Sequence, residues 1–128
     1  MIVDSSAIVA VLLRQPGYEL LLDRLSEERG AAVGAATLAE SGIVATARMG
    51  DRGRTLLARF VDECDLVIIP FGDDHWSVAI DAFARFGRGR HPAGLNFGDC
   101  LTYATARIAD EPLLYLGDDF AKTDLQLA

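Results

Sequence analysis

Short apolar segments alternate along the chain with longer segments in which apolar residues recur every three or four positions. The short segments are residues 1–3, 31–35, 66–69 and 113–116, and they lack polar residues at alternate positions. Strands of a parallel sheet that is covered on both faces have this composition, because neither face meets water. The pattern predicts a central parallel sheet of four or five buried strands.

The longer segments between these strands are predicted to be helices. Leu21, Leu22 and Leu25 share one face of such a segment, and Asp4 with the two serines after it provides helix-capping side chains. The predicted helices cover residues 7–13, 18–28, 37–49, 51–63, 73–86 and 99–109. Alternating strands and helices indicate an α/β fold of three layers, with the sheet flanked by helices. Because no linker or repeat interrupts the pattern, residues 1–128 are expected to form one domain.

Composition adds limits to this picture. Hydrophobic residues make up 51% of the chain, which excludes a disordered protein. No apolar run approaches the roughly 20 residues that span a membrane, and the N-terminal segment has an acid at Asp4 and no basic region. No membrane association and a cytoplasmic location are therefore expected. Cys64 and Cys100 lie far apart, at no spacing typical of a zinc site.

The formal net charge of −7 by itself argues against binding of nucleic acids, because phosphate contacts need cations. The charge is unevenly distributed, however. Arg85, Arg88, Arg90 and His91 fall within seven residues of each other, in and before a glycine-rich loop. A local basic segment can bind phosphates although the whole chain is acidic.

Acidic residues stand at positions where α/β proteins usually place their sites. In a parallel sheet, sites form outside the carboxyl ends of the strands. Asp4 follows the first predicted strand, and Asp118 and Asp119 follow the last one. Glu40 lies on a helix that is otherwise nearly apolar, and Asp99 begins a later helix.

Each acid also has a purely structural interpretation. Asp4 is a good helix N-cap, Asp99 favours the helix dipole, and Glu40 fits a narrow solvent-facing stripe. Together they indicate more, because clustered carboxylates repel one another unless a cation neutralises them. Oxygen-only ligands suit Mg²⁺ or Mn²⁺, and Mg²⁺ can activate water and hold phosphate oxygens. No arrangement of serine or cysteine with histidine suggests covalent catalysis. The chemistry expected is hydrolysis of a phosphodiester.

Motifs in four parts of the chain resemble those of PIN-domain ribonucleases of the VapC toxin type. They are Ile-Val-Asp-Ser-Ser-Ala at residues 2–7, Ala-Glu at 39–40, Gly-Arg-His-Pro-Ala-Gly-Leu-Asn-Phe-Gly-Asp-Cys at 89–100, and Leu-Leu-Tyr-Leu-Gly-Asp-Asp-Phe at 113–120, with Thr-Asp after it at 123–124. The resemblance covers nearly the whole chain in order, and the combination is far more specific than any single motif.

The resemblance implies a set of site residues. Asp4, Glu40 and Asp99 match the acids of the family's metal site, and either Asp118 or Asp119 matches the fourth acid. Ser6 matches a hydroxyl expected to orient a carboxylate or a water. The family further implies a PIN-like fold, a homodimer, Mg²⁺-dependent cleavage of RNA and inhibition by a cognate antitoxin of the VapB type.

Residues near the third motif are expected to contact the substrate. Arg88, Arg90 and His91, with Arg85 before them, are predicted to hold RNA phosphates beside the metal. A solvated flexible loop is the structural alternative. His91 also has a pKa range suited to a general base. Asn96 is predicted to form a hydrogen bond near the metal or substrate, or else to stabilise a turn.

Aromatic residues on a helix provide a further candidate surface. Trp76 and Phe83 lie seven residues apart and are expected to pack, although a dimer or antitoxin groove is an alternative.

Other functions fit less well. A phosphatase of the haloacid dehalogenase type needs a second Asp where this chain has Ser6, and a response-regulator receiver needs a lysine for which Lys122 is misplaced. A non-catalytic binding module would not need to retain all of the acids. A metal-dependent nuclease acting on DNA would use the same site, since no residue visibly recognises a 2′-hydroxyl.

Overall fold

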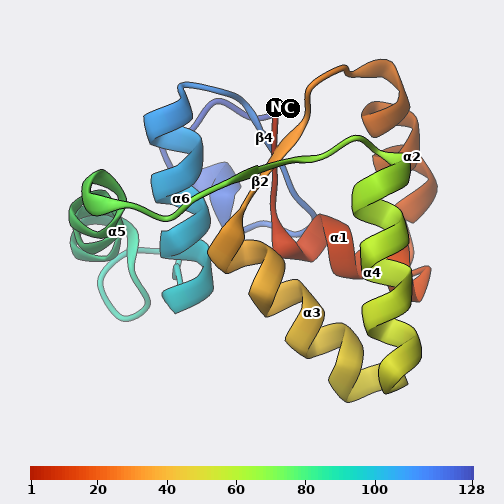
Figure 1. Ribbon diagram of the computed structural model, residues 1–128. Coiled ribbons are helices and arrows are strands. Elements are labelled where there is room, and N and C mark those ends of the chain that lie inside the picture. The colour runs from red at the N-terminus through yellow and green to blue at the C-terminus, as the bar shows by residue number, and fades with distance from the viewer.

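A four-stranded parallel sheet forms the centre of the computed structural model, which describes residues 1–128 (Figure 1). The strands are β1 (Ile2–Val3), β2 (Ala32–Gly34), β3 (Val67–Ile69) and β4 (Leu113–Leu114), in the order β3-β2-β1-β4. Ile2 of β1 is in register with Ala32 of β2 and with Leu113 of β4. The predicted α/β fold with a parallel sheet is confirmed, and the sheet has the smaller of the two predicted numbers of strands.

Helices connect the strands as the periodicity predicts. They are α1 (Ser5–Leu13), α2 (Tyr18–Glu27), α3 (Ala35–Met49), α4 (Asp51–Glu63), α5 (Asp73–Phe86), α6 (Phe97–Ala109) and the 3₁₀ helix η1 (Phe120–Lys122). The largest differences from prediction lie at N-termini. Helix α3 begins at Ala35, a residue predicted to end a strand, and α6 begins at Phe97 because Asn96 caps it. None of the helices is both long and apolar enough to span a membrane.

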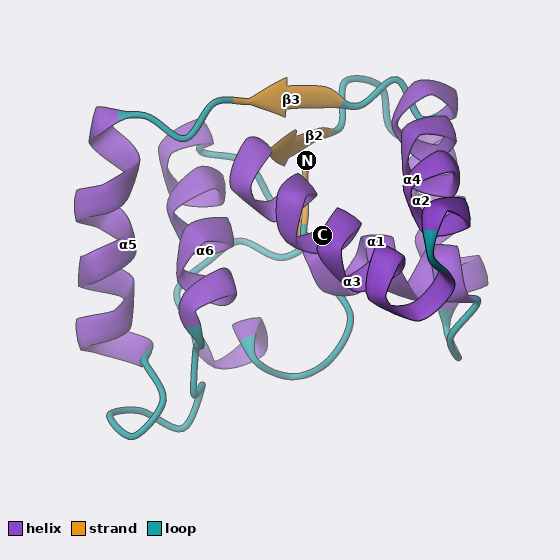
Figure 2. Cartoon of the chain, turned by 60° about the horizontal axis from the view of Figure 1, so that its bottom comes forward, coloured by secondary structure: helices purple, strands orange, loops and turns teal.

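The sheet separates two hydrophobic cores. Val3 belongs to the core formed with α1, α2 and α4, whereas its neighbour Ile2 belongs to the core formed with α5 and α6. Successive residues of a strand point to opposite faces, so β1 contributes to both cores. Figure 2 shows α5 and α6 on one side of the molecule and α1, α2 and α4 on the other. This arrangement produces the three layers.

The prediction that residues 66–69 form a buried strand was wrong for the isolated chain. Strand β3 is at the edge of the sheet and pairs only with β2. Val67 and Ile68 are 54% and 48% exposed, although Leu66 just before them is buried. The apolar sequence indicated a strand correctly, but burial also depends on its place in the sheet.

The carboxyl ends of β1 and β4 lie side by side and bring distant parts of the chain together. The amide of Asp4 donates to the carbonyl of Leu114 at 2.9 Å, immediately after the two strands. The turn that carries Asp118 and Asp119 leaves β4 at this edge. Strand pairing therefore brings the first residues of the chain close to a segment more than one hundred positions away.

Candidate active site

Asp4 is the most deeply buried acid of the chain, with only 2% of its surface exposed. It follows β1 and caps α1, where its Oδ2 accepts a hydrogen bond of 3.0 Å from the amide of Ser6. Its Oδ1 accepts a bond of 2.8 Å from the hydroxyl of Thr102 on α6. Both oxygens thus have a protein donor, which offsets the cost of burying the carboxylate.

The hydroxyl of Ser6 connects α1 to the segment after β4. Its Oγ accepts a hydrogen bond of 2.9 Å from the amide of Leu116, two positions before Asp118. The contact with the Asp4 carboxylate is made by the Ser6 amide rather than by this hydroxyl. Ser6 therefore anchors the turn that carries Asp118 and Asp119, and the orienting role expected from the resemblance stays a prediction.

Asp99 lies in the first turn of α6 and forms a reciprocal capping arrangement with Asn96. The Asp99 amide donates to Asn96 Oδ1 at 2.9 Å, and the Asn96 amide donates to Asp99 Oδ2 at 3.1 Å. Such a capping box satisfies two amides that the helix leaves without partners. The structural alternative for Asn96, a turn role, is therefore realised. It also fixes Asn96 next to the carboxylate of Asp99.

The environment of Asp99 shows that other carboxylates lie close to it. Burial is the main reason that the pKa of Asp99 rises from 3.8 to about 7, and the negative charges of Asp4 and Asp119 and a side-chain hydrogen bond with Asp119 raise it further. The bond from the Asn96 amide opposes this shift. Of the two adjacent candidates for the fourth acid, Asp119 is the one that interacts with Asp99.

Glu40 reaches the same region from α3. A Cβ atom added to Gly98 would lie 2.9 Å from both Cδ and Oε1 of Glu40. The Glu40 carboxylate therefore rests against the backbone just before Asp99. A side chain at position 98 would force Glu40 to move, which explains why a glycine suits this position beside an acid.

The donor set suits a hard divalent cation. Asp4, Glu40, Asp99 and Asp119 offer only carboxylate oxygens, which Mg²⁺ and Mn²⁺ prefer, and their mutual repulsion favours a cation between them. They do not converge on one point, since no group of three such side chains lies within reach of a single ion. Asp99 instead faces the Asn96 amide, so joint coordination requires its side chain to rotate. The chemistry of the four carboxylates therefore suits Mg²⁺ or Mn²⁺, and their arrangement suits the ion once the Asp99 side chain rotates.

The basic segment has two distinct parts. Arg88 and Arg90 are exposed on the loop that leads into α6, and the Arg90 guanidinium lies 5.5 Å from the centre of the Phe83 ring. Arg85 instead forms an ion pair of 3.0 Å with Asp124. The structure gives Arg85 a role in holding the C-terminal segment, while Arg88 and Arg90 have no acidic partner.

His91 has a structural role within this loop. Its Nδ1 accepts a bond of 3.0 Å from the amide of Ala93, and its ring packs edge-on against Phe86. An Nδ1 that accepts leaves the proton of a neutral imidazole on Nε2. This nitrogen is then available as a donor, and the contact with phosphate stays a prediction for His91.

Several residues that support the acids were not predicted from the sequence. Thr37 and Thr102 are buried, and their hydroxyl oxygens lie 3.0 Å apart beside Asp4. Thr102 stands three positions after Asp99, on the same helix face. This spacing was the available indication. Tyr103 was also missed; its hydroxyl donates to Asp124 at 2.7 Å.

Comparison with known proteins identifies the family. The model of the PIN domain matches residues 1–125. The chain is 44% identical to Ribonuclease VapC36 of Mycobacterium tuberculosis over 127 residues, which cover 98% of this chain and 91% of the relative. It is 35% identical to Ribonuclease VapC of Mycolicibacterium smegmatis over 125 residues, covering 98% and 97%.

Solved structures agree in fold. VapC20 of Mycobacterium tuberculosis, described as a toxin that cleaves the sarcin-ricin loop, matches with a TM-score of 0.79 at 15% identity, over 99% of this chain and 97% of that one. VapBC2 of Rickettsia felis, bound to promoter DNA, matches with a TM-score of 0.79 at 17% identity, over 99% and 96%. The chain belongs to the PIN-domain family and, within it, to the VapC ribonucleases.

Proposed function

We propose that this chain is the toxin of a type II toxin–antitoxin system and that it hydrolyses RNA with Mg²⁺, for which Mn²⁺ can substitute. The observation that carries the proposal is that the negative charges of Asp4 and Asp119, together with burial, raise the pKa of Asp99, so these carboxylates lie within electrostatic range of one another. The identity of 44% to a VapC ribonuclease supports RNA as the substrate.

Asp4, Glu40 and Asp99 are the proposed metal ligands. When bound, Mg²⁺ would lower the pKa of a water and neutralise charge on the phosphate. Asp4 is held in place by the amide of Ser6 and the hydroxyl of Thr102, so it is the fixed member of the set. Because its pKa is raised to about 7, Asp99 is only partly ionised near neutral pH, and binding of a cation would favour its ionised form.

The remaining acids and the basic loop have supporting roles in this proposal. Asp119, adjacent to Asp118 in the exposed turn after β4, contributes to the raised pKa of Asp99 and is the better candidate for the fourth acid. Arg88, Arg90 and His91 contact phosphates of the RNA. Asn96 orients Asp99 through the capping box.

Cleavage of RNA by the purified protein tests the proposal. We expect Mg²⁺-dependent cleavage of total RNA, no cleavage in EDTA, and a loss of more than about 100-fold in Asp4→Asn, because losing a ligand should exceed the 10- to 100-fold cost of losing an outer partner. Asp62→Asn, which neutralises an exposed acid on α4, is the matched control.

Full activity in EDTA, or equal activity of Asp4→Asn and Asp62→Asn, would show that the acids are not a metal site. Single-stranded DNA of the same sequence is included as a substrate. Preferential cleavage of this DNA would show that DNA, rather than RNA, is the substrate. It would not contradict the proposed metal site.

An antitoxin of the VapB type is the proposed partner. The solved structures that share this fold include VapBC2 of Rickettsia felis and a toxin-antitoxin complex of Klebsiella pneumoniae. An arginine of such a partner would pair with the carboxylates, because guanidinium binds carboxylate through two parallel hydrogen bonds. A cytoplasmic location is part of the proposal, since RNA and the antitoxin would be met there.

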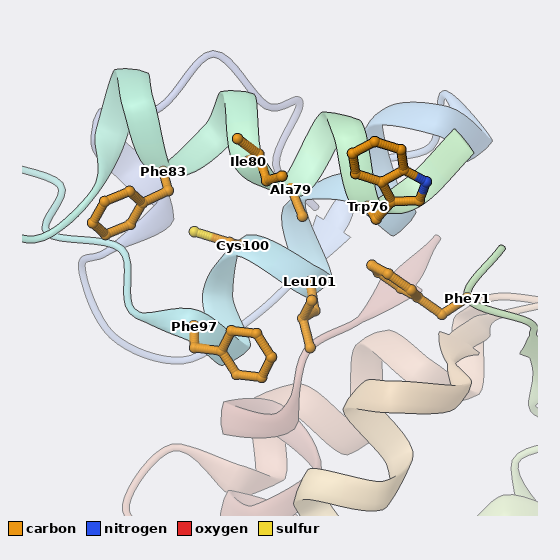
Figure 3. Close-up of a pocket in the computed structure, with 8 residues that line it drawn as sticks. All are labelled: Phe71, Trp76, Ala79, Ile80, Phe83, Phe97, Cys100 and Leu101. Atoms are coloured by element: carbon orange, nitrogen blue, oxygen red, sulfur yellow. The ribbon is translucent and has the colours of Figure 1, made fainter. Parts of the chain in front are cut away.

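We further propose that the protein is a homodimer. An apolar groove between α5 and α6, with a volume of about 480 Å³, is lined by Phe71, Trp76, Ala79, Ile80, Phe83, Phe97, Cys100 and Leu101 (Figure 3). Phe97 is 79% exposed, and Trp76 and Ile80 are also largely exposed. Continuous exposed apolar surface of this kind is typical of an interface, so a second copy is the proposed cover.

A further inference from the structure

We propose that Thr102 is a positioning residue for the active site and that its hydroxyl, supported by Thr37, fixes the orientation of the Asp4 carboxylate. This inference rests on the proposed metal-dependent function and deepens it. It assigns a role in assembling the site to two residues that carry no charge.

The contacts of Thr102 form a continuous chain in the interior. Its hydroxyl donates to Asp4 Oδ1 at 2.8 Å, and its oxygen lies 3.0 Å from the hydroxyl oxygen of Thr37. All three residues are almost completely buried. Each hydroxyl therefore has a protein partner in a part of the molecule that is closed to solvent.

The direction of the chain follows from the number of hydrogens. A threonine hydroxyl carries one hydrogen, and Thr102 gives it to Asp4. Thr37 must therefore be the donor in the contact with Thr102. A hydroxyl that accepts one hydrogen bond donates a stronger one, so Thr37 strengthens the bond to the carboxylate.

An ordinary buried threonine in a helix behaves differently. Thr105, one turn later on α6, donates to the carbonyl of Leu101 four positions earlier. This is the usual way in which a helical hydroxyl is satisfied. Thr102 instead reaches a carboxylate 98 positions away in the sequence. The contrast within one helix indicates that the role of Thr102 goes beyond filling the core.

The chain also joins the segments that carry the other acids. Thr102 lies three positions after Asp99 on α6, and Thr37 lies three positions before Glu40 on α3. Residues at this spacing share a helix face. The pair of hydroxyls therefore links α3 and α6 to the end of β1, and it sets the spacing between Asp4 and the helices of Asp99 and Glu40.

The bonds leave defined positions on Asp4 for a cation. Each carboxylate oxygen has about two acceptor sites. The Ser6 amide occupies one on Oδ2, and the Thr102 hydroxyl occupies one on Oδ1. With both oxygens held, the carboxylate does not rotate, and its remaining acceptor sites keep a fixed direction. Loss of the Thr102 bond would leave only the Ser6 amide on Oδ2, so the carboxylate would be held less firmly while the backbone bond from Asp4 to Leu114 remains.

Calorimetric titration of the protein with Mn²⁺ tests the inference without relying on activity. We expect Thr102→Val to weaken Mn²⁺ binding by about 10- to 100-fold, the range typical for loss of a residue that orients a ligand. Thr102→Ser, which keeps the hydroxyl, should restore the affinity to within a few-fold. Thr105→Val is the matched control, because it removes a buried hydroxyl from the same helix that does not contact Asp4.

Kinetics on RNA separates positioning from general damage. Because Thr102 does not touch the substrate, kcat at fixed Mn²⁺ should fall in Thr102→Val while KM for RNA stays unchanged. Thermal unfolding shows whether each variant folds. If Thr102→Val does not fold, Thr37→Val decides the question, since it removes the supporting donor and leaves the bond from Thr102 to Asp4. A weaker Mn²⁺ affinity in Thr37→Val supports the inference.

Equal Mn²⁺ affinity in Thr102→Val and Thr105→Val would overturn the inference while leaving the proposed function intact. Unchanged affinity in Thr37→Val, where that variant decides, has the same meaning. A wild-type protein that binds no Mn²⁺ and cleaves no RNA with it would overturn the proposed function and this inference together.

Discussion

Asp99 takes part in capping α6, and nearby carboxylates disfavour the ionised form of its carboxyl group. Its pKa in the folded protein is about 7, against 3.8 as the ordinary value. Because the folded value is the higher one, protonation of Asp99 favours the folded state. Its contribution to stability is complete below about pH 4 and is lost as the pH rises through 7.

We therefore expect the protein in EDTA to unfold at a lower temperature at pH 8 than at pH 5. In Asp99→Asn, which cannot ionise at this position, much of that difference should disappear. Thermal unfolding across this pH range measures both effects. Adding Mn²⁺ should raise the melting temperature of the wild type at pH 8, where Asp99 is ionised, and should raise that of the variant less.

An identical pH dependence in the wild type and in Asp99→Asn would show that burial and charge do not perturb this carboxyl group. Asp62→Asn serves as the comparison, because Asp62 is an exposed acid on α4. It should leave the pH dependence of the wild type unchanged.

At the scale of single residues, the sequence identified the acidic residues better than the residues that hold them in place. Asp4 and Asp99 stood out because a charge at a strand end, or at the start of an apolar helix, needs a reason. Thr102 did not stand out, since threonine is common in helices and its partner is 98 positions away. Arg85 was assigned to RNA because its partner Asp124, 39 positions later, becomes a neighbour only in the folded chain.

Helices α3 and α4 meet at a tight turn and diverge from it, as Figure 1 shows, and Gly53 lies near this turn, where the two backbones come close. A Cβ atom at this position would lie 2.5 Å from the carbonyl carbon of Ala45. Gly53→Ala should therefore destabilise the protein by about 2–3 kcal/mol through overpacking. Without this contact, alanine in a helix would stabilise by about 1 kcal/mol.

Denaturant unfolding followed by circular dichroism measures the change. Arg54→Ala, at the next and exposed position of α4, should alter the free energy of unfolding by less than about 0.5 kcal/mol. A stabilised Gly53→Ala variant would mean that the two helices are not in close backbone contact.

Elements were predicted well where local pattern determines them. Helices α2, α4 and α5 begin and end within one residue of the prediction, because apolar spacing and glycines mark them. The exposure of β3 was not predictable in the same way. Which strand lies at the edge depends on the order β3-β2-β1-β4, and this order arises from contacts between segments far apart in the sequence.

On the scale of the whole molecule, an acidic protein must bind an acidic polymer through a limited area. Arg88 and Arg90 lie on the exposed loop that enters α6 near Asp99. Replacing both with Ala should weaken RNA binding on all sequences. A plot of the logarithm of the RNA-binding constant against the logarithm of salt concentration should also become less steep. Its slope should fall by about 0.7 for each phosphate that the variant no longer neutralises. Fluorescence anisotropy with labelled RNA in the Asp4→Asn background avoids cleavage.

Replacing Arg52 and Arg59 on α4 with Ala changes the net charge equally at another surface. If this control lowers the salt dependence as much as the loop variant, the effect comes from overall charge rather than from direct binding of phosphates by the loop.

His91→Ala should lower turnover of saturating RNA far less than Asp4→Asn. A comparable loss, with disappearance of a titration near neutral pH, would instead identify His91 as a general base.

The proposed dimer uses the apolar groove between α5 and α6 as its interface. Ile80→Lys introduces a charge among the apolar side chains of this groove and should weaken dimerisation by at least about 10-fold, since burying a large apolar side chain contributes about 1.5–3 kcal/mol. Light scattering over micromolar concentrations measures the change. Leu20→Lys, at an exposed position of α2, is the control. A monomeric wild type in this range would contradict the dimer.

The position of β1 between β2 and β4 has a consequence for synthesis of the protein. Asp4 is synthesised well before its hydrogen-bond partners, since Thr102 follows it by 98 positions and Leu114 lies still further along the chain. A growing chain therefore lacks the bonds that hold Asp4 until the segment from Thr102 to Leu114 has been made. An RNA-cleaving protein built in this order would stay inactive until the segment that carries β4 has left the ribosome, and a product that ends before Thr102 would lack the hydroxyl that holds the Asp4 carboxylate.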